Sequence, residues 1–125
     1  LILMGKNTFR KAERLSRKKW IQELFEKGSS FNSYPYRIVF LDHPETPAAH
    51  NQVLFSVSKK VFKRAVDRNK VKRRMREAYR LNKGPESLSG KLLIAYIYTA
   101  REILPSTILK EKLAKTWGTI SVRKI

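Results

Sequence analysis

Residues 59–80 read KKVFKRAVDRNKVKRRMREAYR, the most informative run in the chain. Eleven of these residues are basic and two are acidic. The apolar residues recur at helical spacing and Lys83-Gly84-Pro85 follows as a stop signal, so we predict a helix over residues 63–81. Its apolar stripe, expected to pack on a sheet, consists of Val71, Met75, Ala78 and Tyr79.

The basic residues of this helix gather on the flank beside the apolar stripe. Like charges four positions apart lie on the same side of a helix and repel one another. Only Glu77 opposes them nearby, so we expect the phosphates of a nucleic acid to supply the missing negative charge. The alternative is an ordinary solvated helix face. The flank consists of Arg68, Asn69, Lys72, Arg73, Arg76 and Arg80.

The composition of the whole chain agrees with a polyanionic partner. Its 125 residues include 28 Lys and Arg against 10 Asp and Glu, a formal net charge of +18. The absence of cysteine excludes disulfides and thiol chemistry. No apolar run approaches the roughly 18 residues of a membrane span, and residues 1–4 are too few for a signal peptide. We therefore expect a soluble, cytoplasmic protein without a membrane partner.

Periodicity elsewhere predicts a mixed α+β fold. Ser16 is the expected N-cap of a first helix that ends at Gly28, and a last helix is expected from Pro105 to Gly118. Strands are predicted over residues 36–41, 53–57 and 92–98, with a short one around Phe31. These elements fit a two-layer sandwich of helices on a small sheet, in the order α-β-β-β-α-β-α.

Residues for protein-based catalysis are scarce. His43 and His50 fall in a predicted surface loop over residues 42–51, without the spacing of a metal site or a nucleophile motif. Asp42 and Asp67 are the only aspartates, which leaves no carboxylate cluster for a two-metal nuclease. We expect no catalytic residue and no small-molecule substrate, and the sequence assigns no metal ligand.

Two motifs together resemble the signature of the bacterial ribonuclease P protein component. The first is Ser56-Val57-Ser58-Lys59-Lys60, and the second has the pattern AV-x-RN-x-x-KR-x-x-RE from Ala65 onward. The resemblance extends over about residues 9–118 and includes Glu13-Arg14-Leu15, Trp20, Phe25 and Gly28.

The resemblance implies a ribonuclease P subunit that binds the catalytic RNA and promotes removal of the 5′ leader from precursor tRNA. The RNA would carry catalysis, with Mg²⁺ held mainly by the RNA, and the accessory protein would be monomeric without it. Residues 1–8 would form a flexible arm and residues 9–125 a single RNA-binding domain. A left-handed β-α-β crossover around the basic helix is also implied, although most such crossovers are right-handed.

Two binding surfaces follow from the resemblance, position by position. The catalytic RNA would contact Lys59, Lys60, Arg64, Arg68, Asn69, Lys72, Arg73, Arg76 and Arg80. A cleft between the first helix and the sheet would hold the single-stranded leader, lined by Trp20, Ile21, Phe25, Tyr36, Arg37, Val39 and Ser58.

The chain departs from the family pattern at four positions. Family members often have an aromatic residue where Ile21 and Val39 stand, so leader stacking is expected to pass to Trp20, Tyr34 or Tyr36. Glycines are common where Leu54 and Phe62 stand, and we expect the core to refill around Phe62.

Three alternatives remain for the function. A small ribosomal or other structural RNA-binding protein has similar composition, and only the ordered motifs argue against it. A DNA-binding regulator would place a helix and a tight turn before its recognition helix, whereas a strand is predicted there. A protein-only nuclease would need the carboxylate cluster that the sequence lacks.

Overall fold

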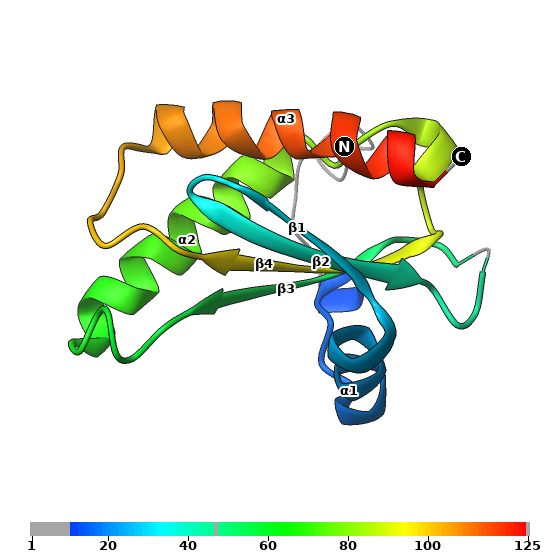
Figure 1. The fold of residues 1–125 in the computed structure, drawn as a ribbon, viewed down its shortest axis with the longest axis horizontal. Helices are drawn as coiled ribbons and strands as arrows, with labels where there is room; N and C mark the ends of the chain where they lie inside the picture. Colours follow the sequence, from blue (N-terminus) through cyan, green and yellow to red (C-terminus); the bar gives the residue numbers. More distant parts are fainter. Residues whose placement is uncertain (1–10, 47, 125) are drawn as a thin grey trace.

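The computed structural model describes residues 11–46 and 48–124, in which three α-helices pack on one four-stranded sheet (Figure 1). Residues 1–8 and Phe9, assigned above to an arm and to the start of the domain, lie outside the described residues. The elements have the expected order α-β-β-β-α-β-α, with short 3₁₀ turns at Lys11–Glu13 and Glu86–Leu88. They are α1 (Lys18–Lys27), β1 (Ser29–Ser33), β2 (Tyr36–Asp42), β3 (Gln52–Val57), α2 (Ala65–Leu81), β4 (Leu92–Tyr98) and α3 (Ser106–Arg123).

The sheet has the strand order β1-β2-β4-β3. β2 lies antiparallel between β1 and β4, whereas β3 pairs parallel with β4. Two parallel neighbours need a long crossover connection, and α2 supplies most of it. The left-handed sense of this crossover stays a prediction of the resemblance.

One face of the sheet forms the main core with α2 and α3. The alternation of β2 sends Tyr36, Ile38 and Phe40 to this face, where they are at most 4% exposed. Val71 and Met75 of the predicted apolar stripe have no exposed surface, and each such burial stabilises the fold by roughly 1.5–3 kcal/mol. The expected packing of the basic helix on the sheet is therefore confirmed.

The opposite face carries α1, which adds a partial third layer to the expected two (Figure 1). Trp20 and Leu24 pack there against Val39, Leu93 and Ala95. The layer is possible because β4 is apolar on both sides, as a central strand should be. Next to it, a Cβ on Gly28 would lie 2.3 Å from the Leu24 carbonyl oxygen, so only glycine allows this turn into β1.

Three predicted boundaries were wrong. Arg17, not Ser16, is the N-cap of α1, and no side chain caps the helix. α2 begins at Ala65 because Arg64 is extended. α3 continues past Gly118, which is solvent-exposed and inside the helix, because Ile120 one turn further on is fully buried against the core.

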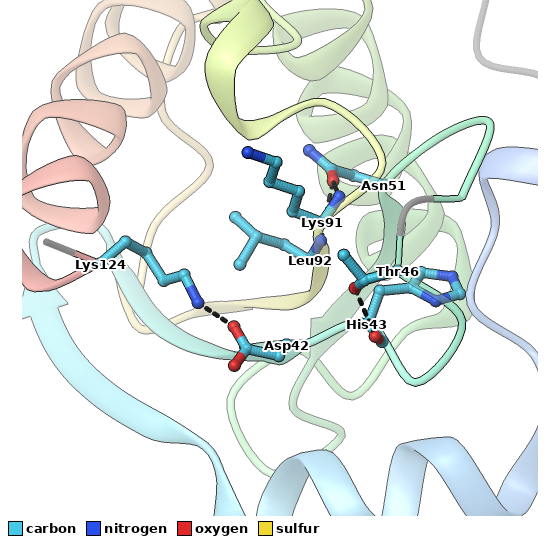
Figure 2. Close-up of polar contacts among 7 residues, drawn as sticks. All are labelled: Asp42, His43, Thr46, Asn51, Lys91, Leu92 and Lys124. Carbon is cyan, nitrogen blue, oxygen red and sulfur yellow. Dashed lines mark hydrogen bonds and ion pairs between the residues drawn. The ribbon is translucent and has the colours of Figure 1, made fainter.

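The segment between β2 and β3 is anchored at both ends (Figure 2). The Asn51 side-chain oxygen accepts hydrogen bonds from the backbone N–H groups of Lys91 and Leu92, both at 2.9 Å. The Asp42 carboxylate forms an ion pair with Lys124 at the end of α3. His43, expected on a surface loop, is instead only 4% exposed, with its ring edge-on to Trp20 at 5.0 Å between centroids.

No helix within residues 11–46 and 48–124 is long and apolar enough to cross a membrane.

Candidate nucleic-acid interface

The solvent-facing flank of α2 is basic, as its sequence predicts. Asn69, Arg73 and Arg76 are exposed, and Arg68, Lys72 and Arg80 are partly buried along the edges of the flank. In the loop before the helix, Lys59, Lys60 and Arg64 are exposed as well. Cations are thereby presented from two adjoining segments, an arrangement that suits a phosphate backbone.

Arg68 differs from its neighbours because it is tied to the loop before α2. Its Nη1 donates hydrogen bonds to the carbonyl oxygens of Phe62 at 2.8 Å and Lys63 at 2.9 Å. Phe62 is buried and packs on Tyr98, with ring centroids 6.0 Å apart, so the expected refilling of the core around Phe62 is confirmed. Arg68 therefore holds the strand-to-helix turn in shape, whatever else it contacts.

Arg80 is partly neutralised at the other end of the flank. Its guanidinium forms an ion pair with Glu77, and the Nε to Oε2 distance is 3.0 Å. The hydrogen bond from Arg80 lowers the pKa of the Glu77 carboxyl, so the pair stays ionised in neutral solution. The most strongly uncompensated part of the flank is thus its middle, at Lys72, Arg73 and Arg76.

Arg74 points away from this flank. Its Nη1 donates to the carbonyl oxygen of Leu104, 2.7 Å away, just before α3 begins. The sequence contains no signal for this role, because a backbone acceptor leaves no mark on side-chain patterning. Arg74 acts as a link between α2 and the segment leading into α3.

The loop before α2 also has a built-in turn. The Ser58 side-chain oxygen accepts a hydrogen bond from the Lys60 backbone N–H at 3.1 Å, and the Ser58 carbonyl accepts from Phe62 N–H at 3.0 Å. This turn sets the direction in which Lys59 and Lys60 leave the sheet.

A second surface lies on the α1 side of the sheet. Strand register aligns one residue from each strand, Asn32, Arg37, Ile97 and Ser56, in a row across that face. Asn32 and Arg37 are exposed, and Ile97 and Ser56 are partly exposed. The row offers polar groups and one cation over an apolar floor.

The residues assigned to the leader cleft differ widely in exposure. Phe25 on α1 is 47% exposed, Arg37 and Ser58 are exposed, and Ile21 is partly buried. Trp20 and Val39 are 8% and 4% exposed and belong chiefly to the small core under α1. The Arg17 guanidinium lies 4.4 Å from the centroid of the Trp20 ring, a contact that the sequence did not reveal.

The assignment of Tyr36 to this surface was wrong. Its side chain lies on the opposite face of the sheet with no exposed area, and its hydroxyl donates to the carbonyl oxygen of Leu109 at 2.9 Å. Burial raises its pKa well above the usual range for tyrosine. Strand alternation sends position 36 toward α3 while Arg37 and Val39 face α1. Of the alternative stacking residues, Tyr34 is 59% exposed.

 A pocket that the sequence did not predict opens beside α2. Its volume is about 310 Å³. The lining residues come from the segment before α1, from β3 and from α2; they are Arg14, Leu15, Ser16, Val53, Leu54, Phe55, Lys72 and Arg76. Arg14 and Ser16 had no place in the predicted sites, because only the tertiary fold brings them beside α2.

Comparisons with known proteins agree with this geometry. The ribonuclease P family model matches residues 9–121. A ribonuclease P protein component from Porphyromonas gingivalis is 51% identical over 73 residues. The aligned part covers 58% of this chain and 53% of that protein, so the chain matches about half of that relative's length. One from Chlorobium phaeobacteroides is 32% identical over 134 aligned residues, covering 95% of this chain and 92% of that protein. A solved structure of a mutant Staphylococcus aureus RNase P protein superposes with a TM-score of 0.74 at 25% identity, covering 89% and 90% of the two chains.

Proposed function

Because the chain belongs to the ribonuclease P protein family, we propose that it is the protein subunit of a ribonuclease P holoenzyme. In this role it binds the catalytic RNA and the 5′ leader of precursor tRNA, and it promotes removal of that leader by the RNA. The basic flank of α2 is the observation that carries the proposal, since its middle presents cations that no carboxylate among the described residues pairs with, on a helix fixed to the core.

The middle of the flank is suited to phosphate. Arg73 and Arg76 are exposed and Lys72 is partly exposed, and none of the ion pairs found among the described residues involves them. Arginine offers forked donors to phosphate oxygens, and lysine offers a compact charge. Binding of a folded RNA through its backbone needs this kind of surface.

The α1 side of the sheet suits a single strand. Exposed Phe25 offers an aromatic ring for base stacking, and Arg37 offers a cation for the backbone within the cross-strand row. Because this surface and the α2 flank lie on different elements, the chain has room for two RNA segments at once. We propose that the leader takes the sheet surface and the catalytic RNA takes the flank.

The chemistry of cleavage is assigned to the RNA. Among residues 11–46 and 48–124, no three His, Cys, Asp or Glu side chains gather into a set that fits a metal ion. Mg²⁺ prefers oxygen ligands and is commonly bound through phosphates, which the RNA supplies in quantity. We propose that Mg²⁺ is held mainly by the RNA, while the protein residues position RNA segments.

The test is cleavage of a precursor tRNA by the ribonuclease P RNA of the same organism at low, near-physiological magnesium. Addition of this protein should strongly stimulate cleavage, and the protein alone should cleave nothing. Replacement of Arg73 and Arg76 by alanine should reduce the stimulation, whereas Lys115→Ala on the exposed side of α3 should not. Tight RNA binding without stimulation would refute the proposal and favour a structural RNA partner.

A further inference from the structure

We propose that the pocket between residues 14–16, β3 and α2 holds a single unpaired nucleotide of the RNA partner. The inference deepens the proposed function, on which it rests, by assigning Arg14 and Ser16 to RNA contact. Neither residue belongs to the two surfaces described above. The pocket adjoins the α2 flank through Lys72 and Arg76, which line it.

The wall that carries Arg14 is held in place by several contacts. Arg14 pairs with Val53 in a parallel bridge, and the Leu15 N–H donates to the Val53 carbonyl oxygen at 3.0 Å. Glu13, which is 2% exposed, forms an ion pair with Lys83 at 2.8 Å beyond the end of α2. The segment is thus attached both to the edge of the sheet and to the segment after α2.

All the charged residues that line the pocket are basic. Arg14, Lys72 and Arg76 are its charged lining residues, and no carboxylate lines it among the described residues. The nearest acidic residue in sequence, Glu13, is buried in its pair with Lys83. Three cations around one hollow favour an anion of concentrated charge, such as a phosphate group.

The remaining lining distinguishes a nucleotide from phosphate alone. Leu15, Val53, Leu54 and Phe55 also line the pocket, and of these four only Leu54 is partly exposed, since the other three are buried. Leu54 offers an apolar contact to a base, and the exposed Ser16 hydroxyl can exchange hydrogen bonds with a ribose 2′-hydroxyl. The volume of about 310 Å³ is at the lower limit of ligand pockets, which suits one nucleotide and excludes a duplex.

The first experiment is a titration of the whole protein with adenosine 5′-monophosphate, followed by amide chemical shifts. Shifts should centre on Ser16, Leu54 and Arg76, and they should be larger than those caused by adenosine or by inorganic phosphate at the same concentration. Equal shifts with phosphate alone, or shifts spread over all basic surfaces, would overturn the nucleotide assignment.

The second experiment measures binding of the catalytic RNA by variants of the pocket. Arg14→Ala should weaken binding about tenfold, the effect of losing a hydrogen bond to a charged group. Ser16→Glu should also weaken binding about tenfold, because it places a carboxylate beside the phosphate. Arg101→Ala and Ser87→Glu are the matched controls, since they change the same residue types at exposed positions elsewhere. Ser16→Glu removes no buried contact, so it tests the pocket even where Arg14→Ala disturbs folding.

The two proposals fail in different ways. If the protein stimulates cleavage but the pocket variants bind RNA as tightly as the controls, the pocket assignment is overturned and the proposed function stands. If the protein does not stimulate cleavage, the proposed function fails, and the nucleotide titration then decides the pocket separately.

Discussion

Replacement of Lys72, Arg73 and Arg76 together by alanine should make RNA binding much less dependent on salt. These residues form the middle of the α2 flank, where no carboxylate among the described residues is paired with them. Arg68 is left out of this variant on purpose, because its Nη1 is bonded to two loop carbonyls and its loss would disturb the fold.

The magnitude follows from counterion release. Each phosphate contact contributes about 0.7 to 0.9 to the slope of log affinity against log salt concentration. If each of the three side chains meets one phosphate, the slope should become shallower by about 2 to 2.7. Affinity should be measured by filter binding of the catalytic RNA across a salt series, with circular dichroism to establish that the variant is folded.

A matched variant distinguishes the loss of phosphate contacts on α2 from the loss of net positive charge. Alanine at Lys110, Lys112 and Lys115 removes three positive charges from α3, so it changes the net charge of the chain by the same amount. Its slope should stay close to that of the unmodified protein. Equal slopes for the α2 variant and the unmodified protein would refute the reasoning, and equal changes in both variants would show that only net charge matters.

The other predictions concern stability and the second surface. Arg68→Ala should lower the free energy of unfolding in urea by about 1–3 kcal/mol, since two hydrogen bonds to loop carbonyls are lost; an unchanged midpoint would contradict this. Phe25→Ala should reduce the preference for binding leader-bearing over mature tRNA and leave the free energy of unfolding unchanged, because the side chain is exposed. Tyr36→Phe should lower the free energy of unfolding by about 1–3 kcal/mol and leave the binding preference intact, because it removes a buried hydrogen bond. Burial lowers the pKa of His43, so the folded state binds fewer protons than the unfolded state. The free energy of unfolding should therefore fall as the pH drops below about 6.5. In urea titrations at several pH values, His43→Gln should make this pH dependence weaker.

The strongest periodic signals in the sequence predicted the fold well. The apolar stripe of α2 and the apolar runs of β2, β3 and β4 each have one dominant period, so their structures differ from prediction by at most two residues at an end. Gly118 misled the prediction of α3 because a glycine is only a weak stop, and burial of Ile120 outweighs its cost.

The sequence predicted the candidate site only where all its residues lie on a single helix. The flank of α2 follows from helical spacing alone, and the structure has it as expected. The role of Arg68 at the loop depends on where two carbonyls lie, and the pocket beside Arg14 depends on a segment that pairs with β3 some forty residues along the chain. Tyr36 was misplaced because a resemblance assigns residues by position along the chain, whereas strand alternation turns the Tyr36 side chain to the face opposite Arg37.

The distribution of acidic residues explains why the flank stays positive in the folded chain. Four ion pairs occur among the described residues, and three of them, at Glu13, Asp42 and Glu111, lie away from the flank. Glu77 pairs with Arg80 at the end of the flank and reaches none of the three cations in its middle by an ion pair. Repulsion along the middle therefore costs the free protein some stability, and an RNA that brings phosphates there removes that cost as it binds. The same charges that weaken the isolated helix thus add to its affinity for a polyanion.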